Sequence, residues 1–143
     1  MLKTKLYSVV GLLIALSILG TGCAAPKPAA LTDEEVTTIA ANILMALDAN
    51  DYAAFSRNFS PDMLAAFSET QFTQTRDMLQ SSSGKYVSTG KLSLSNNQGY
   101  AVYRIICTYE KENVVVTIVF KVDGKQVEGL FFDSPNLRTA TKK

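Results

Sequence analysis

Residues 103–132, YRIICTYEKENVVVTIVFKVDGKQVEGLFF, decide the fold because they hold three strand-like segments separated by turn residues. The first belongs to a run at 100–109 that is dense in β-branched and aromatic residues, which favours a strand. VVVTIVFKV at 114–122 and QVEGLFF at 126–132 follow, and Asp123-Gly124 between them is a hairpin signal. A looser alternation over 86–94 precedes all three. The sequence therefore predicts four antiparallel strands joined by short turns.

The strand at 114–122 also predicts which side of the sheet is buried. Side chains alternate between the two faces of a strand, so every second residue shares a face. One face is wholly apolar and consists of Val114, Val116, Ile118, Phe120 and Val122. The other face is mixed and consists of Val115, Thr117, Val119 and Lys121. We expect the apolar face to pack on helices and the mixed face to be partly solvated.

Helical periodicity precedes the strands. Thr32 and Glu35 form a capping-box pattern, and an apolar stripe follows over 36–47, which predicts a helix over 33–49. The pattern restarts over 51–59, again at Ser60-Pro61, and again over 68–80. Helices first and strands after predict an α+β domain over 31–134, with a flexible tail over 135–143.

The N-terminal residues 1–23, MLKTKLYSVVGLLIALSILGTGC, have the order of a secretory signal: two lysines, an apolar run, then small residues. We expect residues 1–22 to be a signal peptide. The stretch 6–26 carries no charge and approaches the roughly 20 residues of a membrane-spanning helix, so an uncleaved anchor is the alternative.

The stretch Leu19-Gly20-Thr21-Gly22-Cys23 resembles the lipobox of prokaryotic lipoproteins, although the large aliphatic residue stands one step earlier than usual. The resemblance implies that Cys23 is lipidated and that residues 23–30, with Pro26 and Pro28, form a lipid-anchored linker. Two acyl chains would hold the protein permanently to a membrane. The expected location is extracytoplasmic, and Ala24 allows the outer membrane in a two-membrane cell.

Charge and residue types narrow the function classes. Without the lysines of the signal, 12 basic residues face 13 acidic ones, and they are scattered, so we expect no nucleic-acid partner. The chain has no histidine, no glycine-rich phosphate loop and no nucleophile elbow. We therefore expect no metal or other cofactor and assign no catalytic residue.

Carboxylates beside a tyrosine are the remaining catalytic motif. Asp48 and Asp51 flank a turn near Tyr52 and could transfer protons if burial raised a carboxyl pKa, but helix capping and a solvated turn are the preferred interpretation. Cys107 lies within a predicted strand and is interpreted as a small buried hydrophobe rather than a reactive thiol.

Four strand residues are weak candidates for ligand binding. Tyr86, Tyr103 and Tyr109 could line a cavity, or could be core residues whose hydroxyls reach the surface. Arg104 could bind an anion, but a cross-strand pair with an acidic residue such as Glu128 is preferred.

DYAAFSRNFSPDMLAAFSETQF at 51–72, SGKYVS at 83–88 and the segment 103–132 together resemble the domain-of-unknown-function family 3887. That family is placed in the nuclear-transport-factor-2-like, or cystatin-like, superfamily. The resemblance implies helices on a curved four-stranded sheet that form a cone-shaped domain around a tapered pocket, and it carries over no catalytic residue.

These observations favour an envelope lipoprotein that binds a small apolar ligand or an envelope protein without catalysis. A small isomerase or dehydratase with a pocket Asp and Tyr is one alternative. A structural dimerisation module is the other, and it would bury the mixed sheet face against a second copy.

Overall fold

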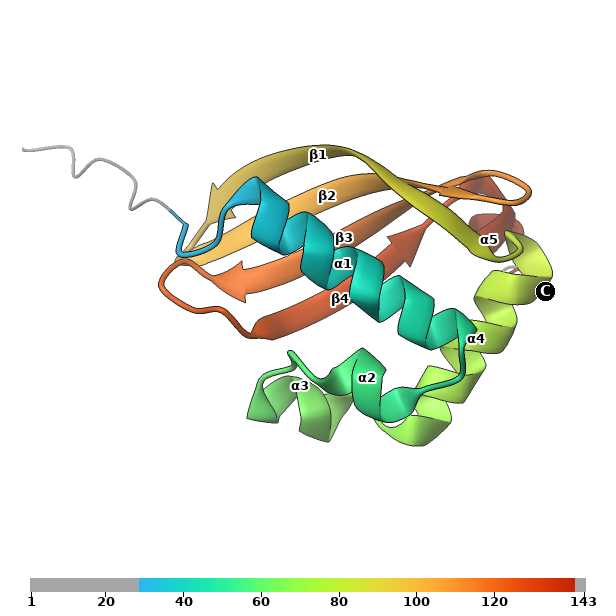
Figure 1. Ribbon diagram of the computed structural model, residues 1–143, viewed down its shortest axis with the longest axis horizontal. Helices are drawn as coiled ribbons and strands as arrows, with labels where there is room; N and C mark the ends of the chain where they lie inside the picture. Colours follow the sequence, from blue (N-terminus) through green and yellow to red (C-terminus); the bar gives the residue numbers. More distant parts are fainter. Residues whose placement is uncertain (1–28, 141–143) are drawn as a thin grey trace, which may run out of the picture.

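Four helices precede the strands along the described chain and one short helix follows them, which confirms the predicted α+β arrangement (Figure 1). The computed structural model describes residues 29–140, so the predicted signal peptide and Cys23 lie outside the described residues. The elements in chain order are α1 (Asp33–Asp48), α2 (Tyr52–Ser56), α3 (Pro61–Ala66), α4 (Glu69–Ser82), β1 (Tyr86–Asn97), β2 (Tyr100–Tyr109), β3 (Asn113–Lys121), β4 (Val127–Asp133) and α5 (Pro135–Ala140). Among these residues, no helix is long and apolar enough to cross a membrane.

Side-chain caps start the helices where the sequence predicts. The Thr32 hydroxyl accepts a hydrogen bond from the Glu35 amide, and the Glu35 carboxylate accepts one from the Thr32 amide at 2.8 Å. Ser60 caps α3, whose first residue is Pro61. Each cap satisfies an amide that has no partner within its helix, so local sequence fixes the start of the helix.

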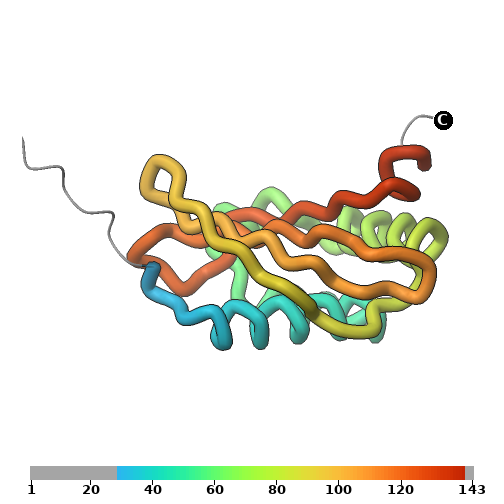
Figure 2. Tube along the Cα trace, turned by 90° about the horizontal axis from the view of Figure 1, so that it is seen from above, coloured from blue at the N-terminus to red at the C-terminus, as the bar shows by residue number. Residues whose placement is uncertain are grey.

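The four strands form one antiparallel sheet in the order β1-β2-β3-β4. Gln98 and Gly99 turn the chain between β1 and β2 with φ values of 48° and 85°, the positive values that tight two-residue hairpins require. The tip of this hairpin projects from the body of the domain (Figure 2). At Gly90, where β1 is irregular, a Cβ atom would lie only 2.7 Å from the carbonyl oxygen of Ile106.

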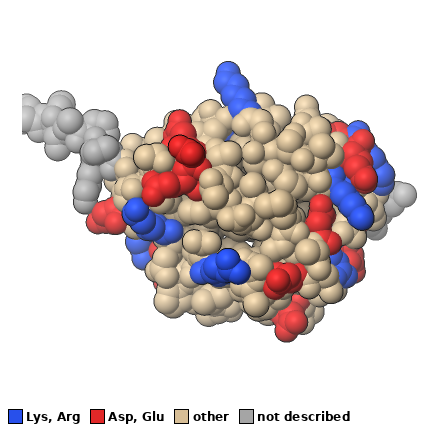
Figure 3. Space-filling model, viewed as in Figure 1, with Lys and Arg blue, Asp and Glu red and all other residues tan. Residues whose placement is uncertain are grey.

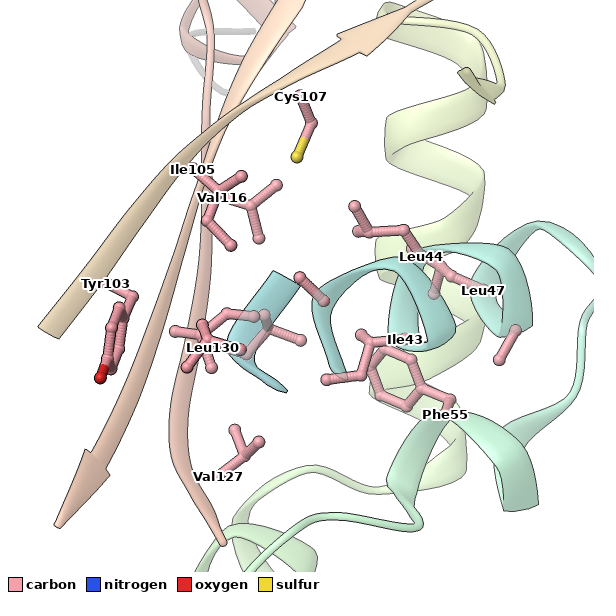
Figure 4. Packing of buried hydrophobic residues seen from close by; sticks show 14 of the residues in the cluster. Ile43, Leu44, Leu47, Phe55, Tyr103, Ile105, Cys107, Val116, Val127 and Leu130 are labelled. Atoms are coloured by element: carbon pink, nitrogen blue, oxygen red, sulfur yellow. The ribbon is translucent and has the colours of Figure 1, made fainter. Parts of the chain in front are cut away.

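The core lies between the helices and one face of the sheet. The apolar stripe of α1 meets the inward residues of β2 and β3, such as Ile105 and Val116 (Figure 4). As predicted from alternation, the inward residues Val114, Val116, Ile118 and Phe120 are all buried. Figures 1 and 2 show α1 running along this face of the sheet.

An aromatic cluster joins the short helices to this core. The ring of Phe55 is 0% exposed and lies 4.9 Å from Phe72, 5.1 Å from Phe59 and 5.4 Å from Phe67, measured between ring centroids. Such ring pairs add stabilisation beyond the area that they bury. The cluster therefore holds α2, α3 and α4 together although α2 and α3 are only one to two turns long.

Part of the segment predicted as a flexible tail, 135–143, is helical. Residues 135–140 form α5, which Pro135 opens and in which Leu137 is 4% exposed. The Ser134 hydroxyl accepts a hydrogen bond from the Leu137 amide. The helix forms because Leu137 buries its side chain in the core, a tertiary contact that the polar residues around it conceal in the sequence.

Candidate functional site

Tyr103 and Tyr109 lie in the core. Tyr103 is 0% exposed, and its hydroxyl donates a hydrogen bond to the Leu31 carbonyl at 3.1 Å. Tyr109 is 4% exposed, and its hydroxyl has no hydrogen-bond partner among the described residues. Burial raises the pKa of Tyr109, so the hydroxyl stays protonated. Of the two alternatives for these tyrosines, the structure shows placement in the core, but neither hydroxyl reaches the surface.

Tyr86 lies beside Tyr109 at the start of β1. The two rings meet edge to face with centroids 6.0 Å apart, and Tyr86 is half-buried. Its backbone amide donates to the Asp48 carboxylate at 2.9 Å. The structure thus brings Tyr86 and Tyr109 together through packing, while Tyr103 packs elsewhere, against Phe120.

The carboxylates near Tyr52 accept hydrogen bonds from backbone amides and do not form a proton-transfer pair with the tyrosine. The Asp51 carboxylate caps α2 by accepting from the Ala54 amide at 2.9 Å. The Tyr52 hydroxyl donates to the Phe67 carbonyl at 2.8 Å. The Asp48 carboxylate accepts from the Tyr86 amide, so Asp48, Asp51 and Tyr52 each have a different hydrogen-bond partner. The preferred interpretation as helix-capping and turn residues is confirmed for Asp51.

Cys107 is confirmed as a buried small hydrophobe. Its side chain is 0% exposed on the inward face of β2 (Figure 4), and burial raises the pKa of its thiol to about 12. A thiol reacts as the thiolate, so this raised pKa makes Cys107 inert near neutral pH. Within residues 29–140, no group of three or more acidic or cysteine residues is placed to hold a metal ion.

Arg104 lies on the opposite face of the sheet, and Glu128, the example given for its acidic partner, does not pair with it. The register places Arg104 across from Thr117, whereas Glu128 pairs with Lys121 at 3.1 Å and accepts from the Ser60 hydroxyl at 2.9 Å. Among the described residues the guanidinium of Arg104 forms no ion pair. The prediction failed because alternation assigns a face but does not fix the register between strands.

This opposite face, which we call the outer face, carries apolar side chains in contact with solvent. Phe131 is 61% exposed, Ile106 43% and Tyr100 41%, while Val102, Val115 and Val119 are half-buried beside them. Other outer-face residues include Lys91, Ser93, Ser95, Arg104, Thr117, Lys121, Glu128, Gly129 and Asp133. The mixed, partly solvated face predicted from the strand at 114–122 is therefore confirmed, and residues of all four strands contribute to it.

Surface pockets of the described residues include two on the outer face. One of about 280 Å³ is lined by Lys91, Ser93, Arg104, Ile106 and Val115. Another of about 360 Å³ includes Tyr100, Val119, Gly129 and Phe131. A groove of about 400 Å³ beside the start of α1 is lined by residues that include Leu31, Ile39 and Lys125. None of these three pockets is lined by the candidate tyrosines.

The opposite, helix-bearing side has a different character. Figure 3 shows that side with Lys and Arg scattered among Asp and Glu and with most of the surface uncharged. The outer face differs from this side in the exposed apolar strand residues Tyr100, Ile106 and Phe131.

Phe131 is the outer-face residue that sequence reasoning missed. Leu130 and Phe132 turn toward the helices, so Phe131 between them must turn away. Its ring lies against Gly129, whose missing side chain leaves space for it. Leu130, Phe131 and Phe132 are consecutive apolar residues in a strand with one buried face. Because side chains alternate between faces, this run could have predicted that Phe131 is exposed.

A family model described as "Protein of unknown function (DUF3887)" matches residues 40–130, from within α1 to β4. No curated protein matches the chain.

Proposed function

The chain belongs to the DUF3887 family, and from this premise we propose that it is a lipid-anchored, extracytoplasmic module that binds a protein partner through the outer face without catalysis. The observation that carries the proposal is the exposure of Phe131, Ile106 and Tyr100 on one sheet face. A solvated sheet face is normally polar, and contiguous exposed apolar side chains mark interaction surfaces.

A protein partner has more support than a small apolar ligand. The tyrosines that would have lined a ligand cavity are packed against other side chains, and two are at most 4% exposed. The outer face instead offers a broad surface with shallow pockets, which suits another protein surface. The isomerase or dehydratase alternative has less support because Asp51 and Tyr52 already bind backbone groups.

The position of Cys23 supports the anchor. Near the start of the described chain, the Ala30 amide donates to the Val122 carbonyl at 2.9 Å, and Leu31 is 7% exposed. The lipobox-like cysteine thus precedes the domain by a short proline-containing linker. A domain held this close to a bilayer meets partners in the same membrane layer at raised effective concentration.

Intact mass spectrometry of the protein from its native membrane tests the anchor. We expect a mature chain that begins at Cys23 and carries acyl mass, and we expect Cys23→Ala to lose that mass. Cys107→Ala is the matched control and should keep it, because Cys107 is buried. An unmodified full-length mass would contradict lipidation and indicate an uncleaved anchor.

Site-specific photo-crosslinking in the native membrane tests the binding surface. A photoreactive residue at Ile106 samples the outer face, and one at Leu64 on α3 is the control, since both side chains are 43% exposed. We expect protein adducts at position 106 that disappear when Phe131→Glu is added, and none at position 64. Equal adducts at both positions, or none at position 106, would refute the proposed surface.

A further inference from the structure

We infer that the partner bound by the outer face is a second copy of this chain, stacked face to face about a two-fold axis parallel to β2 and β3. This inference rests on the proposed function and names its partner. A two-fold axis makes a surface bind itself, so the surface must complement its own rotated image. The register of the sheet gives the outer-face positions that such a rotation brings together.

The strand register places the outer-face residues in rows across the sheet. One row runs Ser95, Val102, Val119 and Gly129; the next runs Ser93, Arg104, Thr117 and Phe131. A third row contains Ile106, Val115 and Asp133. An axis between β2 and β3 exchanges β2 with β3 and β1 with β4. It therefore sets Val102 against Val119 of the second copy and Ile106 against its Val115. These apolar contacts lie on either side of the row in which Arg104 faces Thr117 of the second copy.

The charges at the two sides of these rows are complementary under the same rotation. Lys91 on β1 shares a pocket with Ile106 and Val115, so it lies at the β1 side of the row that ends in Asp133 on β4. Exchange of β1 with β4 brings Lys91 of each copy to Asp133 of the other. Lys91 forms no ion pair among the described residues, and Asp133, which already binds Arg138, keeps free lone pairs because a carboxylate has about four acceptor sites.

The anchor selects this axis over the perpendicular one. Ala30, where the linker joins the domain, is hydrogen-bonded to Val122 at the end of β3. Rotation about an axis parallel to the strands keeps both Ala30 residues at the same end of the dimer. Both linkers can then reach one membrane, whereas an axis across the strands would place them at opposite ends.

The available area suits a weak or moderate dimer. With strands of 9 and 10 residues at the centre, the face is about 30 Å long and about 19 Å wide for four strands at normal spacing. Two such faces amount to about 1,100 Å², just above the roughly 1,000 Å² expected of a specific interface. Membrane anchoring would favour association at this area because it concentrates the two copies.

Chemical cross-linking of the full chain in its native membrane tests the inference. In Thr117→Cys the new thiol lies near the axis, and stacked sheets lie about 10 Å apart, within reach of a short bis-maleimide. We expect a cross-linked species of twice the chain mass. Leu64→Cys is the control and should give none, and Cys107 should not react because it is buried.

Charge reversal distinguishes the proposed pairing from other dimers. Lys91→Asp and Asp133→Lys, each in the Thr117→Cys background, should each lower the cross-linked fraction about tenfold, because each sets two like charges against each other. Co-expression of the two variants should restore cross-linking, since every contact in the mixed dimer then joins opposite charges. Unchanged thermal unfolding of each variant would show that the fold is intact.

The outcomes separate this inference from the proposed function. No double-mass species in Thr117→Cys, or no recovery in the mixture, overturns the two-fold dimer. If photo-crosslinking at Ile106 then gives adducts with a different protein, the outer face is still a binding surface and only the identity of the partner is wrong. If position 106 gives no adduct, both proposals fail.

Discussion

The Ser83 hydroxyl donates a hydrogen bond of 2.6 Å to the Glu112 carboxylate, which joins the end of α4 to the turn between β2 and β3. The same carboxylate accepts from the Ser134 hydroxyl at 2.7 Å and from the Asn136 amide at 3.2 Å. Ser83 and Ser134 are 0% and 2% exposed. Glu112 therefore holds three segments that are far apart in the sequence, including the start of α5.

Glu112→Ala should destabilise the domain by about 2 kcal/mol, because it leaves two buried hydroxyls without their acceptor. Chemical denaturation of the two proteins would measure the change in the free energy of unfolding. Glu34→Ala, at an exposed position in the first turn of α1, is the control and should cost less than about 0.5 kcal/mol. A similar loss in both variants would show that the Glu112 bonds contribute little.

The contribution of Glu112 should depend on pH. Burial alone would raise the pKa of Glu112, but the hydrogen bonds from Ser83, Ser134 and Asn136 lower it below its usual 4.5. A carboxyl with a lowered folded-state pKa stabilises the fold above its unfolded-state pKa, and this stabilisation is lost as pH falls through the folded-state pKa. The difference in unfolding free energy between wild type and Glu112→Ala should stay constant from neutral pH to about 6 and shrink below about 4. A difference that grows in acid would contradict this assignment.

Phe55→Ala should destabilise the domain by about 3 to 5 kcal/mol, since it opens a cavity at the centre of the aromatic cluster. Phe131→Ala removes the same atoms from a ring that is 61% exposed and should cost less than about 1 kcal/mol in the monomer. Thermal or chemical unfolding of the two variants in parallel checks the contrast. A large loss from Phe131→Ala would mean that this ring stabilises the fold itself.

The two buried tyrosine hydroxyls should respond in opposite directions to the same change. Tyr103→Phe loses the hydrogen bond to Leu31 and should cost about 1 kcal/mol. Tyr109→Phe removes a buried hydroxyl that has no partner among the described residues, so it should be neutral or stabilising. Unfolding free energies of both variants provide the test. A loss above about 1 kcal/mol for Tyr109→Phe would reveal a bound water or ligand at that hydroxyl.

Local patterns predicted most of the elements correctly. The caps at Thr32 and Ser60 start α1 and α3 as expected because the cap and the amide that it binds are within three residues. Alternation along 114–120 identified the buried sheet face. Helix caps and strand alternation involve residues that are close in the sequence, so they could be predicted without the structure.

The candidate site was less predictable. Arg104 was expected beside Glu128, but the register sets it across from Thr117. Tyr109 was expected either to line a cavity or to lie in the core with its hydroxyl at the surface, but its side chain is 4% exposed and packs against Tyr86 of β1. Each outcome depends on how segments many residues apart align, and single-residue patterns do not specify that alignment.

The sequence by itself determined the α+β order of the elements and the inward face of the sheet, because hydrophobic periodicity and capping act over a few residues. Only the tertiary structure decided that α5 packs through Leu137, that Glu112 joins distant segments, and that Phe131, Ile106 and Tyr100 gather on one open surface. The physical reason is that strand register and helix docking depend on the packing of the whole core, which involves residues from every segment at once.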